Sequence, residues 1–150
     1  AYRALEKGDP EPLFRSASAR FADGSDVMTA VHLSESDFQT LIAATLYFDN
    51  DVEVVREAQA QGAKGGRIDL LIRPTAGSPV KHTFLVELKY LSKAEGKTES
   101  AVKEAKEKAL SQLRRYARCS NIRGISNLKC VAAVFVGTQL AEFVTEDVAG

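Results

Sequence analysis

The chain has 150 residues, of which 45% are hydrophobic and 27% charged, a composition typical of one globular domain rather than a disordered or fibrous protein. Its 20 basic and 20 acidic side chains cancel, so the sequence does not indicate a protein that holds nucleic acid by bulk charge alone. No apolar run approaches the roughly 20 residues that a bilayer-spanning helix needs.

The N-terminus and the two cysteines bear on where the protein works. The chain begins with Ala1 rather than Met, and no basic-then-apolar signal segment follows. Cys119 and Cys130 are too few for a disulfide scaffold, so we expect free thiols, with Cys130 as a small core residue. These features predict a part excised from a longer protein, located in the cytoplasm of a bacterial-type cell and outside any membrane.

Residues 1–33 are predicted to form an N-terminal helical extension. From Tyr2 to about Asp23 the pattern is helical, with a break at 8–10 that contains glycine and proline. The apolar positions that define the pattern are Leu5, Leu13, Phe14, Ala17 and Phe21. The stretch from Gly24 to Leu33 gives no clear signal.

Residues 34–150 are predicted to form the main part of one compact domain. Its first helix should begin after Ser34, with Asp37 completing a capping box, and should end at the turn residues 49–51. The face that this helix buries would carry Phe38, Leu41, Ile42 and Leu46.

Three strands are predicted next, over 52–58, 67–73 and 83–90, joined by short glycine-containing loops that favour an antiparallel meander. A charged helix over about 98–118 follows, and the apolar run 128–136 is typical of a central strand buried on both faces. Residues 140–144 fit either an edge strand or a helical turn. The order is therefore αβββαβ, an α/β (α+β) fold with a mixed sheet flanked by helices.

Charged residues interrupt two of these apolar strands. Alternation places Glu87 and Lys89 on the same face as Leu85, opposite Phe84, Val86 and Leu88. Asp69 interrupts the preceding strand in the same way, and hairpin pairing would bring it near Glu87. Burying such groups is costly unless they are paired, hydrated or bound to a metal. One interpretation is a simple salt bridge of Lys89; the other is a magnesium site, because carboxylate oxygens suit that ion.

Two further residues favour the second interpretation. Gln112 and Tyr116 lie one turn apart on the same face of the following helix. With Asp69 on the second strand, Glu87 and Lys89 on the third, and this Gln–Tyr pair, the sequence resembles the PD-(D/E)XK nuclease superfamily over roughly residues 35 to 137. Ile68 stands where the motif name has proline, and isoleucine is common at this position in that superfamily.

The resemblance implies the αβββαβ restriction-endonuclease-like fold and phosphodiester hydrolysis. Asp69 and Glu87 would hold Mg²⁺ or Mn²⁺, with the Leu88 carbonyl as a further ligand, while Lys89 would act on the attacking water and Gln112 would complete the catalytic set. Glu35 is the candidate for an additional carboxylate ligand, although an acid in the first turn of a helix is also simply stabilising. Glu53 and Glu57 are weaker candidates, and we expect His32 and His82 to lie in loops or at the surface without a metal.

Basic residues are concentrated in the second half of the chain. The candidates for contacts with nucleic acid are Tyr116, Arg114, Arg115, Lys103, Lys106 and Arg67. A solvated helix face is the alternative interpretation of this charge. DNA is favoured over RNA as the partner, although these residues do not distinguish the two.

The resemblance is closest to a bacterial branch found C-terminal to AAA-ATPase-like domains, and the stretch Ala4–Asp9 is similar to the segment that leads into this nuclease domain. We therefore expect an AAA-ATPase-like domain in the full-length protein, or an inhibitory partner if the domain is a toxin or effector. The rival hypothesis is a binding module that has kept the fold without catalysis, since fold alone does not establish function.

Overall fold

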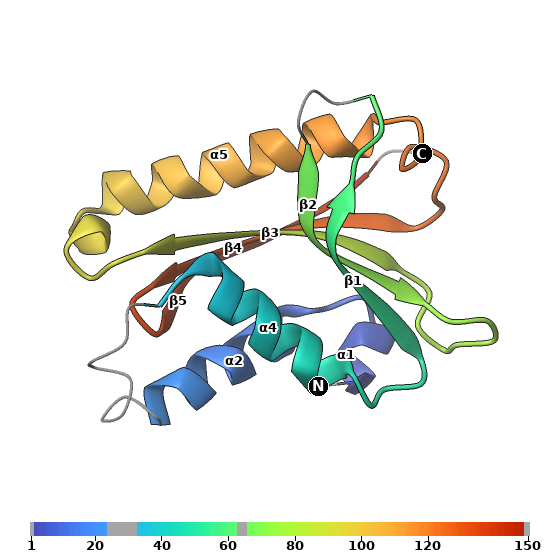
Figure 1. The fold of residues 1–150 in the computed structure, drawn as a ribbon, viewed down its shortest axis with the longest axis horizontal. Helices are drawn as coiled ribbons and strands as arrows, with labels where there is room; N and C mark the ends of the chain where they lie inside the picture. The colour runs from blue at the N-terminus through green and yellow to red at the C-terminus, as the bar shows by residue number, and fades with distance from the viewer. Residues whose placement is uncertain (1, 24–32, 63–65, 149–150) are drawn as a thin grey trace.

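The computed structural model describes residues 2–23, 33–62 and 66–148. In these ranges, three helices are followed by three strands, a fourth helix and two more strands of the same sheet (Figure 1). The elements are α1 (Tyr2–Glu6), α2 (Glu11–Asp23), α4 (Glu35–Leu46), β1 (Val52–Gln59), β2 (Arg67–Pro74), β3 (Thr83–Leu91), the short 3₁₀ turn η1 (Glu95–Lys97), α5 (Glu99–Ala117), β4 (Leu128–Val136) and β5 (Gln139–Asp147). This is the predicted αβββαβ order with helices before it. His32 and the centre of the turn at 62–66 lie outside the described residues.

The five strands form one mixed sheet in the order β1-β2-β3-β4-β5. The meander β1–β2–β3 is antiparallel, as predicted, and β3 then pairs in parallel with β4 after the crossover through α5. The stretch 140–144, which the sequence left open, belongs to the edge strand β5, antiparallel to β4. Gly137 turns the chain between them at φ 59, a conformation that glycine adopts without strain.

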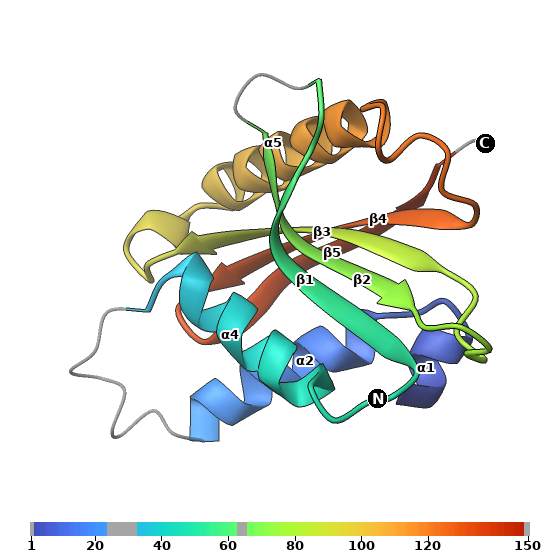
Figure 2. The ribbon, with the colours of Figure 1, turned by 45° about the vertical axis from the view of Figure 1, so that its right-hand side comes forward.

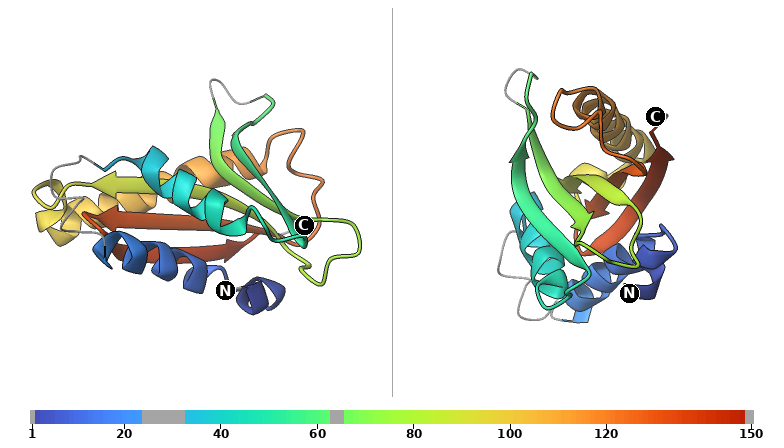
Figure 3. Two further views of the ribbon diagram at one scale, coloured as in Figure 1. Left: turned by 60° about the horizontal axis from the view of Figure 1, so that its bottom comes forward. Right: turned by 90° about the vertical axis from the view of Figure 1, so that its right-hand side faces the viewer.

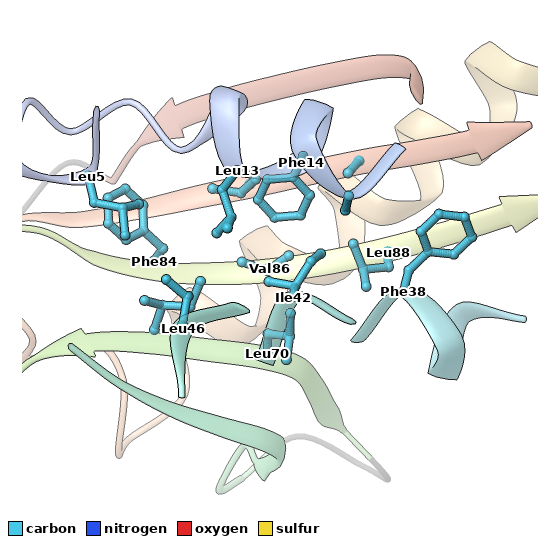
Figure 4. Close-up of a cluster of buried hydrophobic side chains, with 14 of the residues drawn as sticks. Leu5, Leu13, Phe14, Phe38, Ile42, Leu46, Leu70, Phe84, Val86 and Leu88 are labelled. Carbon is cyan, nitrogen blue, oxygen red and sulfur yellow. The ribbon is translucent and has the colours of Figure 1, made fainter. Parts of the chain in front are cut away.

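Two hydrophobic clusters cover the two faces of the sheet. Figure 3 shows α2 and α4 on one face and α5 on the other. The first cluster joins α1, α2 and α4 to alternate residues of β3, namely Phe84, Val86 and Leu88 (Figure 4). Leu85 belongs to the second cluster, beneath α5. The predicted alternation along β3 is therefore confirmed.

The N-terminal helices contribute to the same core as the rest of the chain. Leu5, Leu13 and Phe14 are buried with Phe38 and Ile42 of α4 (Figure 4). The break between α1 and α2 forms at Gly8, whose φ is 77, and the Asp9 carboxylate accepts the Glu11 N–H at 3.1 Å. The helical extension thus packs directly on the sheet.

The start of α4 follows the predicted capping pattern. The backbone N–H of Ser34 donates to the Asp37 carboxylate at 2.7 Å, which fixes the first turn. Phe38, four residues after this cap, stacks on Phe135 with ring centroids 3.9 Å apart. The cap and this stack together set the direction in which the N-terminal end of α4 approaches the sheet at β4.

The β1–β2 hairpin bends away from the rest of the sheet at the end that carries its turn. Pairing of β2 with β3 extends only from Leu70↔Val86 to Ile72↔Phe84, whereas β3 remains paired with β4 as far as Leu91. Figure 2 shows the hairpin twisting out of the sheet toward the end of α5. No helix in the described ranges is long and apolar enough to cross a membrane.

Candidate active site

The predicted site residues Asp69 and Glu87 meet where β2 leaves β3. The Leu88 N–H donates to Asp69 Oδ2 at 2.8 Å, and the Asp69 N–H donates to Glu87 Oε1 at 3.2 Å. These side-chain bonds continue from the last backbone pair, Leu70↔Val86, after which the two strands separate. The predicted hairpin proximity of the two acids is therefore confirmed.

Burial makes both acids unusually weak. Glu87 is only 3% exposed, and this burial, together with the charge of Asp69, raises the pKa of Glu87 to about 8. Burial likewise raises the pKa of Asp69 to about 6, although the hydrogen bond from Leu88 acts in the opposite direction. Two carboxyl groups in such surroundings strongly favour a bound positive charge.

Lys89 lies on the same face of β3 and is partly buried. Its positive charge lowers the pKa of both Asp69 and Glu87, so the ammonium group is near them. Within the described ranges, however, Lys89 forms no ion pair with either acid. A simple salt bridge of Lys89 is thus not what the structure shows.

Glu35 approaches the pair from the first turn of α4. Its Oε1 accepts the Tyr90 N–H at 3.4 Å, on the edge of β3 that β2 has left free, and its charge raises the pKa of Asp69. Glu35 therefore lies beside the site, whereas the weaker candidate Glu53 is paired with Arg73 at 2.9 Å, further along the hairpin.

Glu57 lies opposite Asp69 in the β1–β2 register. The bridge pairs Arg56↔Leu70 and Ala58↔Ile68 flank it, and its φ of 54 is rare for a residue other than glycine. The Glu57 side chain is exposed, and its charge contributes to the raised pKa of Asp69. The sequence offered Glu57 only as a weaker candidate than Glu35, and its role as a ligand stays a prediction.

Two residues of α5 lie over the same face of the sheet. The Tyr116 ring is buried in the second core cluster, and burial, together with the charge of Glu87, raises the pKa of its phenol. Arg115 places its guanidinium 5.3 Å from the centre of the Tyr116 ring. The Oε1 atom of Gln112 is buried and has no hydrogen-bond partner among the described residues. Gln112 is therefore not simply solvated.

A family model described as the PD-(D/E)XK nuclease superfamily matches residues 33–143. The chain belongs to this nuclease superfamily. Searches of curated proteins and of solved structures gave no significant match. Membership indicates nuclease activity on nucleic acid with a divalent metal. Asp69 lies on β2 and the Glu87–Leu88–Lys89 triplet on β3, and their assignment to the motif of the superfamily stays a prediction.

The donors at this candidate site fit a hard divalent cation. Mg²⁺ is commonly bound through one or two carboxylates and several waters, and Asp69 and Glu87 are two buried carboxylates whose raised pKa values reflect their burial. In residues 2–23, 33–62 and 66–148, no group of three or more His, Cys, Asp or Glu side chains is close enough to hold an ion. Glu35 is therefore a neighbour of the pair in this structure, and its role as a ligand stays a prediction.

The basic residues predicted to contact nucleic acid are spread over the PD-(D/E)XK domain. Arg114 is held by Glu146 of β5, with Nε 3.1 Å from Oε2, and Lys103 lines a cavity beside Glu142. The ammonium nitrogen of Lys106 lies 3.9 Å from Oε1 of Glu107. Arg67 is exposed where β2 begins. The contacts of all these residues with nucleic acid stay predictions.

Asn121, in the loop after α5, holds the hairpin in place and was not identified from the sequence. Its side chain accepts the Gln61 N–H at 2.9 Å and donates to the Gln59 carbonyl at 2.9 Å. The α5–β4 loop is thus joined to the end of β1, next to the strand that carries Asp69. No local pattern marks a loop residue whose partners lie so far away in the sequence.

Both cysteines are free, and Cys130 is buried, as predicted. Cys119 is buried as well, which the sequence did not indicate. His82 lies in the loop before β3, partly buried beside Gly8, whose missing side chain leaves room for the imidazole ring.

Proposed function

We propose that this domain is a Mg²⁺- or Mn²⁺-dependent nuclease that hydrolyses phosphodiester bonds of DNA. The observation that carries the proposal is the pair of buried carboxylates, Asp69 and Glu87, joined by hydrogen bonds where β2 separates from β3 with Lys89 beside them. A domain of a nuclease superfamily that retains all three of these residues is unlike a pure binding module.

Asp69, Glu87 and the Leu88 carbonyl would hold the cation. Since the N–H and C=O of one strand residue point to the same edge, the Leu88 carbonyl faces the edge from which its N–H reaches Asp69. When bound, the cation lowers the pKa of a coordinated water and stabilises the charge that develops on the phosphate.

Lys89 would orient the attacking water and offset negative charge in the transition state, because it is near both carboxylates without being neutralised by either. Gln112 would hold a water or a phosphate oxygen with its amide, and Tyr116 would bound the same site from α5. Such contacts with the phosphate backbone would position a nucleic-acid strand without distinguishing its base sequence.

A cleavage assay tests this function. Purified protein with Mg²⁺ is offered linear DNA, circular DNA and RNA, and we expect cleavage of DNA that EDTA abolishes. Asp69→Asn and Glu87→Gln should each lose cleavage while keeping the fold. Glu53→Gln, which removes a glutamate charge on β1 far from the pair, is the matched control and should cleave normally. Full activity of Asp69→Asn would refute the assignment.

The same proposal extends to the partners. An AAA-ATPase-like domain elsewhere in the full-length protein, or an inhibitory partner, would regulate access to the site. Sequencing of the coding region around this domain and copurification of the full-length protein test that expectation.

A further inference from the structure

A second feature of the surface lies on the side of α5 away from β2. There, the C-terminal end of α5, the loop after it and the end of β5 surround a cavity of about 600 Å³. Three arginines line it, Arg114, Arg118 and Arg123, together with two acids, Glu146 and Asp147. The charge of this cavity depends on which of these groups neutralise one another.

Each acid of the cavity already has a basic partner. Glu146 is held by Arg114, and Asp147 lies 3.6 Å from the ammonium group of Lys129. Arg118 and Arg123 are exposed, and neither has a carboxylate partner among the described residues. Two guanidinium groups therefore remain to attract an anion.

Helix stabilisation accounts for only part of this charge. Arg118 donates from Nε to the Arg114 carbonyl at 3.2 Å, a contact expected of a cation at the end of a helix. Arg123 lies well past the end of α5, where that effect has decayed. Helix capping therefore does not explain why Arg123 lines the cavity.

The floor of the cavity is uncharged. Ala117 and Cys130 are buried there, and burial raises the pKa of the Cys130 thiol to about 11, so it stays neutral. Val148 packs beside them. An apolar floor below two free guanidinium groups suits a ligand with a phosphate group next to a less polar sugar or base, because arginine binds phosphate with two parallel hydrogen bonds.

The cavity and the candidate active site share the end of α5. Tyr116 packs in the core cluster that contains Leu85, on the face of β3 that also carries Glu87, and Arg118, two residues later, lines the cavity. A ligand that extends around this end of the helix would reach both places. A polymer of linked phosphates meets that requirement, whereas a single phosphate does not.

We propose that the cavity lined by Arg118 and Arg123 is a second contact site for the phosphodiester backbone of the nucleic-acid substrate, next to the cleavage site. The proposal rests on the proposed nuclease function. It assigns the substrate an additional requirement: the strand must extend several nucleotides beyond the bond that is cleaved.

Binding as a function of strand length tests this site. Fluorescence anisotropy in EDTA measures the affinity for labelled DNA strands of increasing length. We expect affinity to rise with length for the wild type. The double variant Arg118→Ala with Arg123→Ala should bind long strands about tenfold more weakly and the shortest strands normally. For long strands, the slope of log affinity against log salt concentration should become less steep by about two phosphate contacts.

The matched control removes two exposed arginines from the other face of the molecule. Arg15→Ala with Arg20→Ala changes the net charge equally on α2 and should leave the length dependence intact. The single variant Arg123→Ala, in an exposed loop, provides the same test if the double variant proves unstable. Identical length dependence in the wild type and the cavity variants would overturn the proposal.

Two further measurements separate the possible failures. If the cavity variant still cleaves the shortest strands with Mg²⁺ but loses the preference for long ones, both the nuclease function and the cavity site are supported. If it cleaves long and short strands as the wild type does, only the cavity site is refuted. Competition by polyglutamate as strong as that by DNA of equal charge would assign the cavity to acidic proteins and overturn the proposal.

Discussion

Asp69 and Glu87 make the stability of the metal-free domain depend on pH. Their pKa values in the folded protein, about 6 and about 8, lie above the ordinary values of 3.8 and 4.5. The folded protein therefore binds more protons than the unfolded chain across this range. The contribution of these protons to stability is complete below the ordinary pKa values. It is lost as the pH rises through the pKa values of the folded protein.

We therefore expect the melting temperature in EDTA to fall between pH 5 and pH 9, and Glu87→Gln to flatten that fall, because its amide cannot ionise. Thermal unfolding followed by circular dichroism measures this effect. Glu53→Gln, at an exposed position where an arginine lowers the pKa, should keep the slope of the wild type. Equal slopes in the wild type and Glu87→Gln would contradict the argument.

Lys89 should affect the rate of cleavage more than binding. Lys89→Met keeps most of the apolar stem and removes a charge that acts on the site acids. We expect kcat to fall by about 100-fold or more while KM stays within a few-fold of the wild type. Steady-state kinetics measure both. A rise in KM with unchanged kcat would place Lys89 in substrate binding instead.

Gln39 is a buried polar residue with an unmet hydrogen bond. It is 3% exposed, and its Oε1 has no hydrogen-bond partner among the described residues. Because an unsatisfied buried group is costly, Gln39→Leu should raise the free energy of unfolding by about 1 kcal/mol. Urea denaturation measures this change. Gln139→Leu, at an exposed position of β5, should not stabilise the fold, and a loss of stability in Gln39→Leu would reveal a partner for the amide.

At the scale of the elements, the turn before α5 depends on a close contact with β4. A Cβ atom on Gly96 would lie 2.5 Å from Val136 Cγ1, which is too close for two carbon atoms. Gly96→Ala should therefore destabilise the fold by about 1–3 kcal/mol. Gly124 meets nothing within 4 Å, so Gly124→Ala should be neutral or slightly stabilising. Chemical denaturation of both variants measures the contrast, and equal effects would refute it.

The elements that the sequence predicts best are those with a strong local signal. Ser34 and Asp37 identify the start of α4, and the alternation around Glu87 fixes which face of β3 meets α5. Residues 140–144 stayed undecided because their pairing with β4 is a tertiary contact. The bond from Asn121 to the hairpin and the left-handed Glu57 also depend on distant neighbours, and no local periodicity reports them.

The same distinction applies to the site. Asp69 and Glu87 could be paired from the sequence because a hairpin connects their strands. The side toward which Arg114 turns could not be predicted, since its partner Glu146 lies on a strand two elements later. The sequence gives the number of basic side chains along a helix. It does not show which of them a neighbouring acid neutralises.

For the molecule as a whole, binding of a divalent cation should be coupled to folding. Mg²⁺ would bind the folded pair of acids and not the unfolded chain, so a concentration of 100 times Kd should add about 2.7 kcal/mol. At pH 8 we expect Mg²⁺ to raise the melting temperature of the wild type and to leave that of Asp69→Asn unchanged. Calorimetric scans with and without Mg²⁺ measure this, and an equal rise in the two proteins would mean that the cation binds elsewhere.

The parallel pairing of β3 with β4 also sets an order of events during synthesis. The meander β1–β3 comes from local sequence and can form as soon as residue 91 has left the ribosome, before β4 and the helix that covers Glu87 have emerged. Until then Glu87 lacks the cover of α5, so we expect its pKa to lie closer to the ordinary value. The burial that raises this pKa is complete only when the crossover closes over the sheet, so we expect the proposed site to form last.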